Sequence, residues 1–205
     1  FFAASDFIEA IISGKGGHAA KPHETIDPTV IASQIVVALQ TIASRRSDPV
    51  EQVVVSITSF ETSSTAFNVI PQEVKIKGTV RTLDPDVRDL AEKEFLRITE
   101  LTAEAMGGSA DAKFTRGYPV MSNSSEQTEF AAKVARDVAG ECAEAPLVMG
   151  GEDFAYMLEE RPGAYILLGN GDSSPVHHPK YNFNDDAIPF GCSWLVELVE
   201  QKMPV

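Results

Sequence analysis

The feature that most constrains the fold is the order in which strand-like and helix-like patterns follow one another over the first 117 residues. Residues 6–13 (DFIEAIIS) are apolar and rich in β-branched side chains, and a glycine-rich loop at residues 14–17 ends them. Three more segments of this character follow, at residues 52–60, 73–83 and 110–115. Four strands in one stretch of chain need a cover on at least one face of the sheet that they form.

Two helices are expected between these strands, and both begin with the same pair of residues. Asp27-Pro28 and Asp84-Pro85 place an N-capping side chain directly before a proline, which is favoured at the first helical position. Apolar residues then recur at helical spacing, up to Arg45-Arg46 in the first helix and Gly107-Gly108 in the second. The order β-α-β-β-α-β predicts an α+β fold of the ferredoxin-like, split βαβ type, with both helices on one face of the sheet.

The pattern of the chain changes after Tyr118. A turn rich in Ser and Asn at residues 122–125 is the expected boundary of a second unit. In this unit helices are predicted at residues 126–139, 152–159 and 186–202, and a strand at residues 164–168. Two or three helices around one or two strands cannot cover both faces of a sheet, so the unit is expected to be part of a larger domain.

Charge and hydropathy narrow the range of partners. The 205 residues include 30 acidic and 17 basic side chains, which gives a formal net charge of −13. This charge disfavours non-specific binding to nucleic acid or to anionic membranes. No apolar run approaches the roughly 20 residues of a membrane span, and the start of the chain lacks the pattern of a secretory signal. A cytoplasmic protein that binds a small molecule or a peptide is therefore expected.

The sequence contains two cysteines. Cys142 and Cys192 are too few for a disulfide framework and lack the paired spacing of zinc ligands, so both are expected to be buried thiols.

The chain begins with Phe-Phe-Ala-Ala-Ser-Asp, without methionine, and leads directly into a strand. This beginning predicts a chain that starts partway through a longer protein.

Three histidines lie in loops that could carry chemistry. His18 stands among glycines and alanines that allow a ligand to approach the backbone, although a loop histidine taken alone is more often a surface or capping residue. His177 and His178 lie in a polar loop, where an imidazole could bind Zn²⁺ or Mn²⁺ or could simply be solvated. Because adjacent histidines rarely bind the same ion, at most one of the pair is expected to be a ligand.

The remaining polar candidates each have a structural explanation as well. Glu152 and Asp153 follow a glycine turn at the start of a helix, where carboxylates cap the helix and interact favourably with its dipole. Arg81, in a strand, could clamp a substrate carboxylate or could pair with a surface acid. Asn68 lies in the long connection between two strands.

Taken together, five segments resemble the M20 metallopeptidases, and among them the branch of aminoacylases, hippurate hydrolases and auxin-conjugate amidohydrolases. They occur in the family's order and span essentially the whole chain. The segments are GGHAAKPH at 16–23, FNVIP at 67–71, GTVRT at 78–82, GEDF at 151–154 and HHPKYNFND at 177–185.

The resemblance implies a domain organisation. Residues 6–117 are similar to the family's dimerisation (lid) domain, which would make the protein a homodimer. Residues 118–205 are similar to the C-terminal part of the α/β catalytic domain that holds two metal ions, with residues 1–5 as the upstream link. The N-terminal catalytic portion, with the other metal ligands and the glutamate that acts as general base, is absent from this sequence.

The resemblance also implies roles for individual residues. His177 is similar to a metal ligand, and the two divalent ions would be Zn²⁺ or Mn²⁺. His18 is similar to the catalytic histidine that reaches into the active site of the partner subunit to stabilise an oxyanion. Asn68 and Arg81 are similar to residues that bind substrate, whereas Glu152, Asp153 and His178 lie near the site without an assigned role.

These roles imply metal-dependent hydrolysis of the amide bond in N-acyl amino acids or similar small substrates. The sequence leaves two alternatives open, a dipeptidase or carboxypeptidase of the same family and a dimerisation or ligand-binding module without catalysis. Because the base and most metal ligands are missing, this chain alone is expected to be inactive.

Overall fold

The computed structural model describes residues 2–203. Phe1, in the expected link, and residues 204–205, at the end of the expected catalytic part, lie outside the described residues. The described chain divides into two compact units. One contains the described residues up to Met121 together with Leu147–Tyr156, and the other contains Ser122–Pro146 together with the described residues from Met157 onward.

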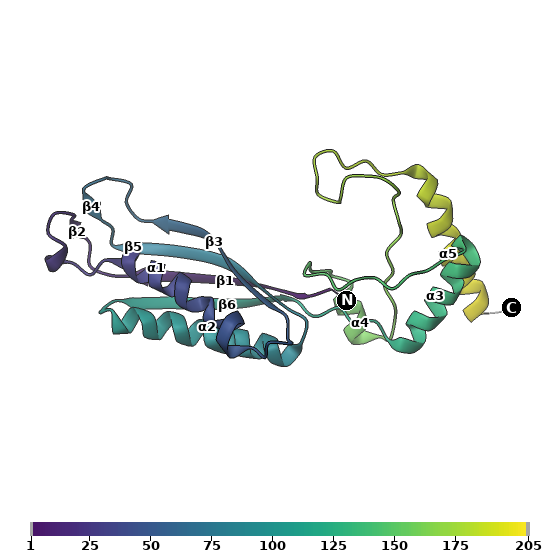
Figure 1. The fold of residues 1–205 in the computed structure, drawn as a ribbon, viewed down its shortest axis with the longest axis horizontal. Coiled ribbons are helices and arrows are strands. Elements are labelled where there is room, and N and C mark those ends of the chain that lie inside the picture. Colours follow the sequence, from purple (N-terminus) through teal and green to yellow (C-terminus); the bar gives the residue numbers. More distant parts are fainter. Residues whose placement is uncertain (1, 204–205) are drawn as a thin grey trace. The chain divides into compact units, whose positions relative to one another are not determined.

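The first unit is a mixed α/β structure with a four-stranded antiparallel sheet (Figure 1). The strands are β1 (Ala4–Ser13), β3 (Val53–Thr62), β5 (Glu73–Thr82) and β6 (Ser109–Tyr118), and their order in the sheet is β3-β5-β1-β6. The short strands β2 (Gly17–His18) and β4 (Val69–Ile70) form a separate two-stranded sheet that sequence patterns did not predict.

The two expected helices are present, and both start at the predicted capping residues. Helix α1 (Pro28–Leu39) is capped by Asp27, which accepts a hydrogen bond from the Thr29 N–H, and continues after Gln40 and Thr41 into a wide π turn at Ile42–Arg46. Helix α2 (Pro85–Ala105) is capped by Asp84. The sequence therefore located both helix starts correctly, because capping is a local interaction.

The hydrophobic core lies between the two helices and one face of the sheet. Alternate residues of the central strands point into it and pack against apolar side chains of α1 and α2, among them Ile8, Ile12, Val74, Ile76, Ile31, Ile35, Leu39 and Phe95. The opposite face of the sheet is more open, and Phe7 at its centre is 57% exposed. Strand residues therefore alternate between a buried and an accessible face.

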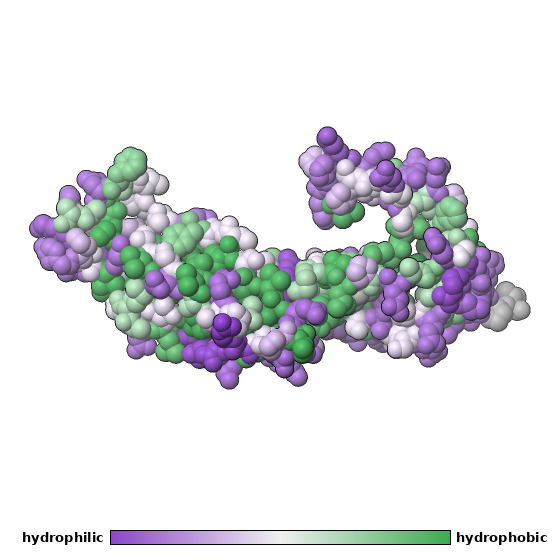
Figure 2. Space-filling model, in the orientation of Figure 1, coloured by the Kyte–Doolittle hydropathy of each residue, from purple (hydrophilic) through white to green (hydrophobic). Residues whose placement is uncertain are grey.

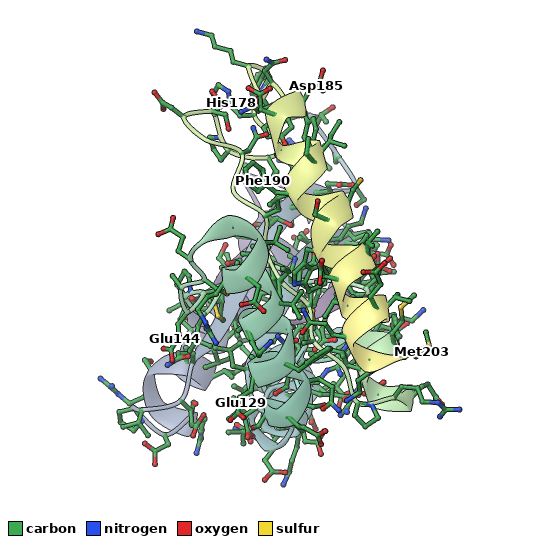
Figure 3. The ribbon with its side chains drawn as sticks, turned by 90° about the vertical axis from the view of Figure 1, so that its right-hand side faces the viewer. Glu129, Glu144, His178, Asp185, Phe190 and Met203 are labelled. Atoms are coloured by element: carbon green, nitrogen blue, oxygen red, sulfur yellow. The ribbon has the colours of Figure 1, made fainter. Side chains whose placement is uncertain are left out.

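The second unit contains α3 (Ser125–Ala139), most of α4 (Ala155–Glu160), a 3-10 turn at Asp185–Ala187 and α5 (Ile188–Lys202). Figure 3 shows α3 and α5 side by side, with His178 in the loop that precedes α5. The Trp194 Nε1–H donates to the Ala131 carbonyl at 3.1 Å, and Lys202 lies 5.2 Å from the centre of the Phe130 ring. These contacts join one turn of α3 to the middle and to the C-terminal end of α5.

Three predictions for this part of the chain were wrong. The described residues form no strand at 164–168, because the N–H and C=O of Tyr165 bond at 2.9 Å to the side-chain amide of Asn123 rather than to another strand. The helix expected from residue 152 begins at Ala155, because Glu152 and Asp153 lie in a preceding turn.

The third wrong prediction concerns the cysteines, which are not buried in this structure. Cys142 is half-buried in an irregular segment, and Cys192 is exposed on α5. Cys192 lies two residues before Trp194, whose side chain bonds to α3. Two residues correspond to about 200° of rotation around a helix, so Cys192 lies on the side of α5 away from α3.

Candidate functional site

His18 and Asn68 are brought together at one end of the first unit, although fifty residues separate them in sequence. His18 pairs with Val69 in the β2–β4 sheet, and the Ala19 N–H donates to the Asn68 carbonyl at 3.0 Å. Both side chains are exposed. In Figure 2 hydrophilic and hydrophobic residues lie next to one another at this end of the unit, where Figure 1 places β2 and β4.

Glycines allow β2 to lie this close to the neighbouring chain. A Cβ on Gly16 would stand 2.8 Å from the Ile70 carbonyl oxygen, and a Cβ on Gly17 would stand 2.7 Å from Cγ2 of Thr25. Both distances are shorter than a carbon atom tolerates against these neighbours. The glycine run therefore determines where the next residue, His18, is held.

The hydrogen bonding of the His18 ring decides what it can offer to a ligand. Its Nδ1 accepts a hydrogen bond from the Ala20 N–H at 3.1 Å. A neutral imidazole with Nδ1 as acceptor carries its proton on Nε2. The exposed edge of the ring is then a hydrogen-bond donor, as an oxyanion would require.

Arg81 lies at the opposite end of the first unit, on β5 of the four-stranded sheet. β5 runs from Glu73, next to the glycine loop, to Thr82, and at roughly 3.4 Å per residue Arg81 is about 27 Å from Glu73. Within one chain, therefore, Arg81 does not share a site with His18 and Asn68.

The end of the sheet around Arg81 contains the glycine turn before Glu152. The Arg81 guanidinium donates to the hydroxyl of Ser5, and a Cβ on Gly151 would come within 3.2 Å of Nη1 of Arg81. Ala3 holds the segment through its N–H, which lies 3.0 Å from the carbonyls of Val148 and Gly150. The structure thus brings Arg81 near the segment that carries Glu152.

Glu152 and Asp153 form hydrogen bonds to residues that follow them closely in the chain. Glu152 Oε1 lies 3.4 Å from the Phe154 nitrogen, and the backbone carbonyls of Glu152 and Asp153 accept from Ala155 and Tyr156. These bonds shape the turn that leads into α4.

A buried ion pair supports the same end of the sheet, and sequence reasoning missed it. Arg88 on α2 contacts both oxygens of Asp6 on β1, and Asp6 Oδ1 also accepts from the Gly117 N–H at 3.0 Å. Asp6 is fully buried. An acid at the start of an apolar strand and an arginine in the first turn of a helix were the available signals.

The two adjacent histidines differ in their surroundings. His178 Nδ1 accepts from the Lys180 N–H at 3.1 Å. Within residues 2–203 the His177 imidazole has no hydrogen-bond or ion-pair partner, and the His177 backbone has φ of +68°, a left-handed conformation uncommon for a residue other than glycine. The free ring of His177 fits a metal ligand better than the engaged ring of His178.

Residues 2–203 do not form a complete metal centre. They contain no group of three or more His, Cys, Asp or Glu side chains that could hold an ion. A metal centre at His177 would therefore need ligands that residues 2–203 do not bring to it in this structure.

The comparisons with known proteins establish the family. Residues 44–201 match the model of peptidase family M20/M25/M40, so the chain belongs to this family of hydrolases.

No helix within residues 2–203 is both long and apolar enough to cross a membrane.

Curated relatives include hydrolases of amides and of peptides. The chain is 37% identical over 201 residues to the N-acetyl-L-cysteine deacetylase of Bacillus subtilis (strain 168) and 39% identical over 216 residues to the IAA-amino acid hydrolase ILR1-like 2 of Arabidopsis thaliana, each covering 98% of this chain and 48% of the relative. It is 35% identical over 195 residues to thermostable carboxypeptidase 2 of Saccharolobus solfataricus, covering 92% and 49%. The chain thus spans about half the length of these relatives.

The chain also spans about half the length of the solved structures that it matches. A putative aminohydrolase from methicillin-resistant Staphylococcus aureus superposes with a TM-score of 0.86 at 35% identity, covering 97% of this chain and 51% of that one. A dinuclear metal binding peptidase of the M20 family from Bacillus subtilis has a TM-score of 0.81 at 28% identity, covering 99% and 51%.

Proposed function

We propose that this chain forms the lid domain and the C-terminal catalytic segment of an amidohydrolase that releases the amino acid from small N-acyl amino acids. Two relatives are named for N-acetyl-L-cysteine and for IAA-amino acids, which supports this substrate class. The observation that carries the proposal is the pairing of β2 with β4, which holds His18 beside Asn68.

His18 is the oxyanion donor in this proposal. Its Nδ1 is engaged by Ala20, so Nε2–H is the group that would face a developing negative charge on the substrate carbonyl oxygen. The exposed Asn68 side chain adds an amide next to it, which can donate to the substrate or accept from it.

Two copies of the chain would contribute to each site. The span of about 27 Å between Glu73 and Arg81 exceeds the length of an N-acyl amino acid, so His18 and Arg81 would bind one substrate only from different subunits. The strand order β3-β5-β1-β6, with helices on one face, supports a ferredoxin-like lid whose edge can pair with a second copy.

The edge strand β3 is the better candidate for that pairing. Glu61 is its one charged residue, whereas the other edge strand, β6, carries Asp111, Lys113 and Arg116. Charged side chains on an edge discourage pairing with another chain.

The metal site in this proposal contains two divalent ions, Zn²⁺ or Mn²⁺, with His177 as one ligand. When bound, such a pair activates a water molecule and polarises the scissile carbonyl. Arg81 would hold the substrate carboxylate, since its planar guanidinium can donate two parallel hydrogen bonds.

The proposal is tested by assaying the full-length protein with Mn²⁺ or Zn²⁺ on N-acetyl and N-aromatic-acyl amino acids and on dipeptides. Hydrolysis of the N-acyl amino acids is expected. No hydrolysis of any substrate, together with metal binding that survives His177→Ala, would contradict the proposal.

A carboxypeptidase of the same family is the second candidate, favoured by the 35% identity to a thermostable carboxypeptidase. The same panel separates the two. Preference for peptides over N-acyl amino acids, measured as kcat/KM, would favour the carboxypeptidase.

A further inference from the structure

The loop that presents His18 contains three glycines within four residues, at positions 14, 16 and 17. Glycine has more backbone freedom than any other residue, so such a loop holds one conformation only when other groups constrain it. One constraint comes from Ile26, which exchanges backbone hydrogen bonds of 2.8 and 3.0 Å with Lys15. Another, beside the pairing of β2 with β4, comes from Gln72.

Gln72 bonds to the glycine loop three times. Its backbone carbonyl accepts from the Gly14 N–H at 3.0 Å. Its side-chain Nε2 donates to the Gly14 carbonyl at 2.6 Å, and its Oε1 accepts from the Gly16 N–H at 3.0 Å. The side-chain amide thus bridges Gly14 and Gly16 through its donor and its acceptor. Gly16 lies two positions before His18.

Gln72 also belongs to the chain segment that carries Asn68. It follows β4 (Val69–Ile70) directly after Pro71, and β4 pairs with Gly17 and His18. A single side chain therefore ties together the two segments whose contact brings His18 beside Asn68.

We infer that Gln72 is a positioning residue for His18. It holds the glycine loop so that the His18 ring lies at one place relative to Asn68, and it does not itself touch the substrate. This inference rests on the proposed role of His18 as an oxyanion donor. Because a donor acts mainly in the transition state, loss of Gln72 lowers kcat and leaves KM nearly unchanged.

The test compares four full-length variants: Gln72→Leu, His18→Ala, the double variant, and Gln52→Leu as a control at an exposed glutamine without a bond to the loop. Misplacing a catalytic group by about 1 Å can cost up to about 100-fold, so Gln72→Leu is expected to lower kcat by about 10- to 100-fold. In the His18→Ala background the same substitution should change kcat by less than about twofold, because the residue through which it acts is already absent. Gln52→Leu should leave kcat unchanged.

A second measurement does not depend on activity. Hydrogen–deuterium exchange, read by mass spectrometry, should accelerate in residues 14–20 of Gln72→Leu and remain unchanged in β1 and β5. Unchanged exchange in residues 14–20 would overturn the inference, and so would an equal loss of kcat with and without His18. A wild-type protein inactive on all substrates would reject the proposed function, and the exchange rates would then decide whether Gln72 holds the loop.

Discussion

Arg88 and Asp6 form a two-pronged ion pair inside the first unit, with Nε 2.9 Å from Oδ2 and Nη2 2.6 Å from Oδ1. Asp6 is completely buried and Arg88 is 9% exposed. The arginine also donates to the Gly117 carbonyl at 3.1 Å. The pair therefore joins α2, β1 and β6 at the end of the sheet where Arg81 lies.

Arg88→Met is expected to destabilise the protein by about 3–5 kcal/mol, because it leaves the Asp6 carboxylate buried without its partner. Chemical denaturation measures the free energy of unfolding. The control is Arg116→Met, which removes two ion pairs to Asp89 and Glu92 from a side chain that is 46% exposed, and it should cost less than about 1 kcal/mol. Equal costs for the two variants would contradict the role assigned to the buried pair.

His18→Ala is expected to lower kcat by about 10²–10³-fold and to leave thermal stability unchanged, since one oxyanion donor is lost and the ring is exposed. The arrangement in trans adds a sharper expectation. Mixing inactive His18→Ala and His177→Ala subunits should restore about one quarter of the wild-type activity, because half of the reassociated dimers are mixed and each has one complete site of two. No recovery on mixing would argue that His18 serves its own subunit.

His177→Ala should reduce the metal content of the full-length protein, whereas His178→Ala should not. The His177 ring is free to bind an ion, and the Nδ1 of His178 is already engaged by the Lys180 N–H. Elemental analysis after dialysis measures both variants against the wild type. Equal metal loss in the two variants would mean that the loop, rather than one ring, matters for binding.

Glu94 makes part of the stability dependent on pH. Hydrogen bonds from Arg97, helped by the charge of Arg46, lower the pKa of Glu94 below its ordinary value of 4.5. A carboxylate with a lowered folded-state pKa stabilises the protein fully above 4.5, and this stabilisation is lost as the pH falls through the folded-state pKa.

Glu94→Gln is therefore expected to lower Tm at neutral pH, and its difference from the wild type should shrink as the pH falls from about 5 to about 3. Differential scanning calorimetry at several pH values measures this. Glu100→Gln, at an exposed position of the same helix without an ion pair in the described chain, is the control. A Tm difference for Glu94→Gln that stays constant with pH would show that the ion pair is not its cause.

Local interactions explain why much of the first unit was predictable from its residues. Strand alternation and the Asp-Pro helix starts depend on neighbours within a few residues, and the structure has both helices beginning at Pro28 and Pro85. Predictions failed where the outcome depended on distant partners. The apolar run at 164–168 was predicted to be a strand, but the backbone of Tyr165 bonds to the Asn123 side chain instead of to a neighbouring strand.

The candidate site likewise has features that the sequence indicated and features that only the tertiary structure determined. The resemblance of five sequence motifs to a known family identified His18, Asn68, Arg81 and His177 as candidates, and such a resemblance can be recognised in the sequence alone. Only the tertiary structure decided that His18 lies beside Asn68, that Arg81 lies at the far end of β5, and that Gln72 bridges Gly14 and Gly16. These relations come from the pairing of segments more than fifty residues apart, and such pairing depends on the packing of the whole unit rather than on any local pattern.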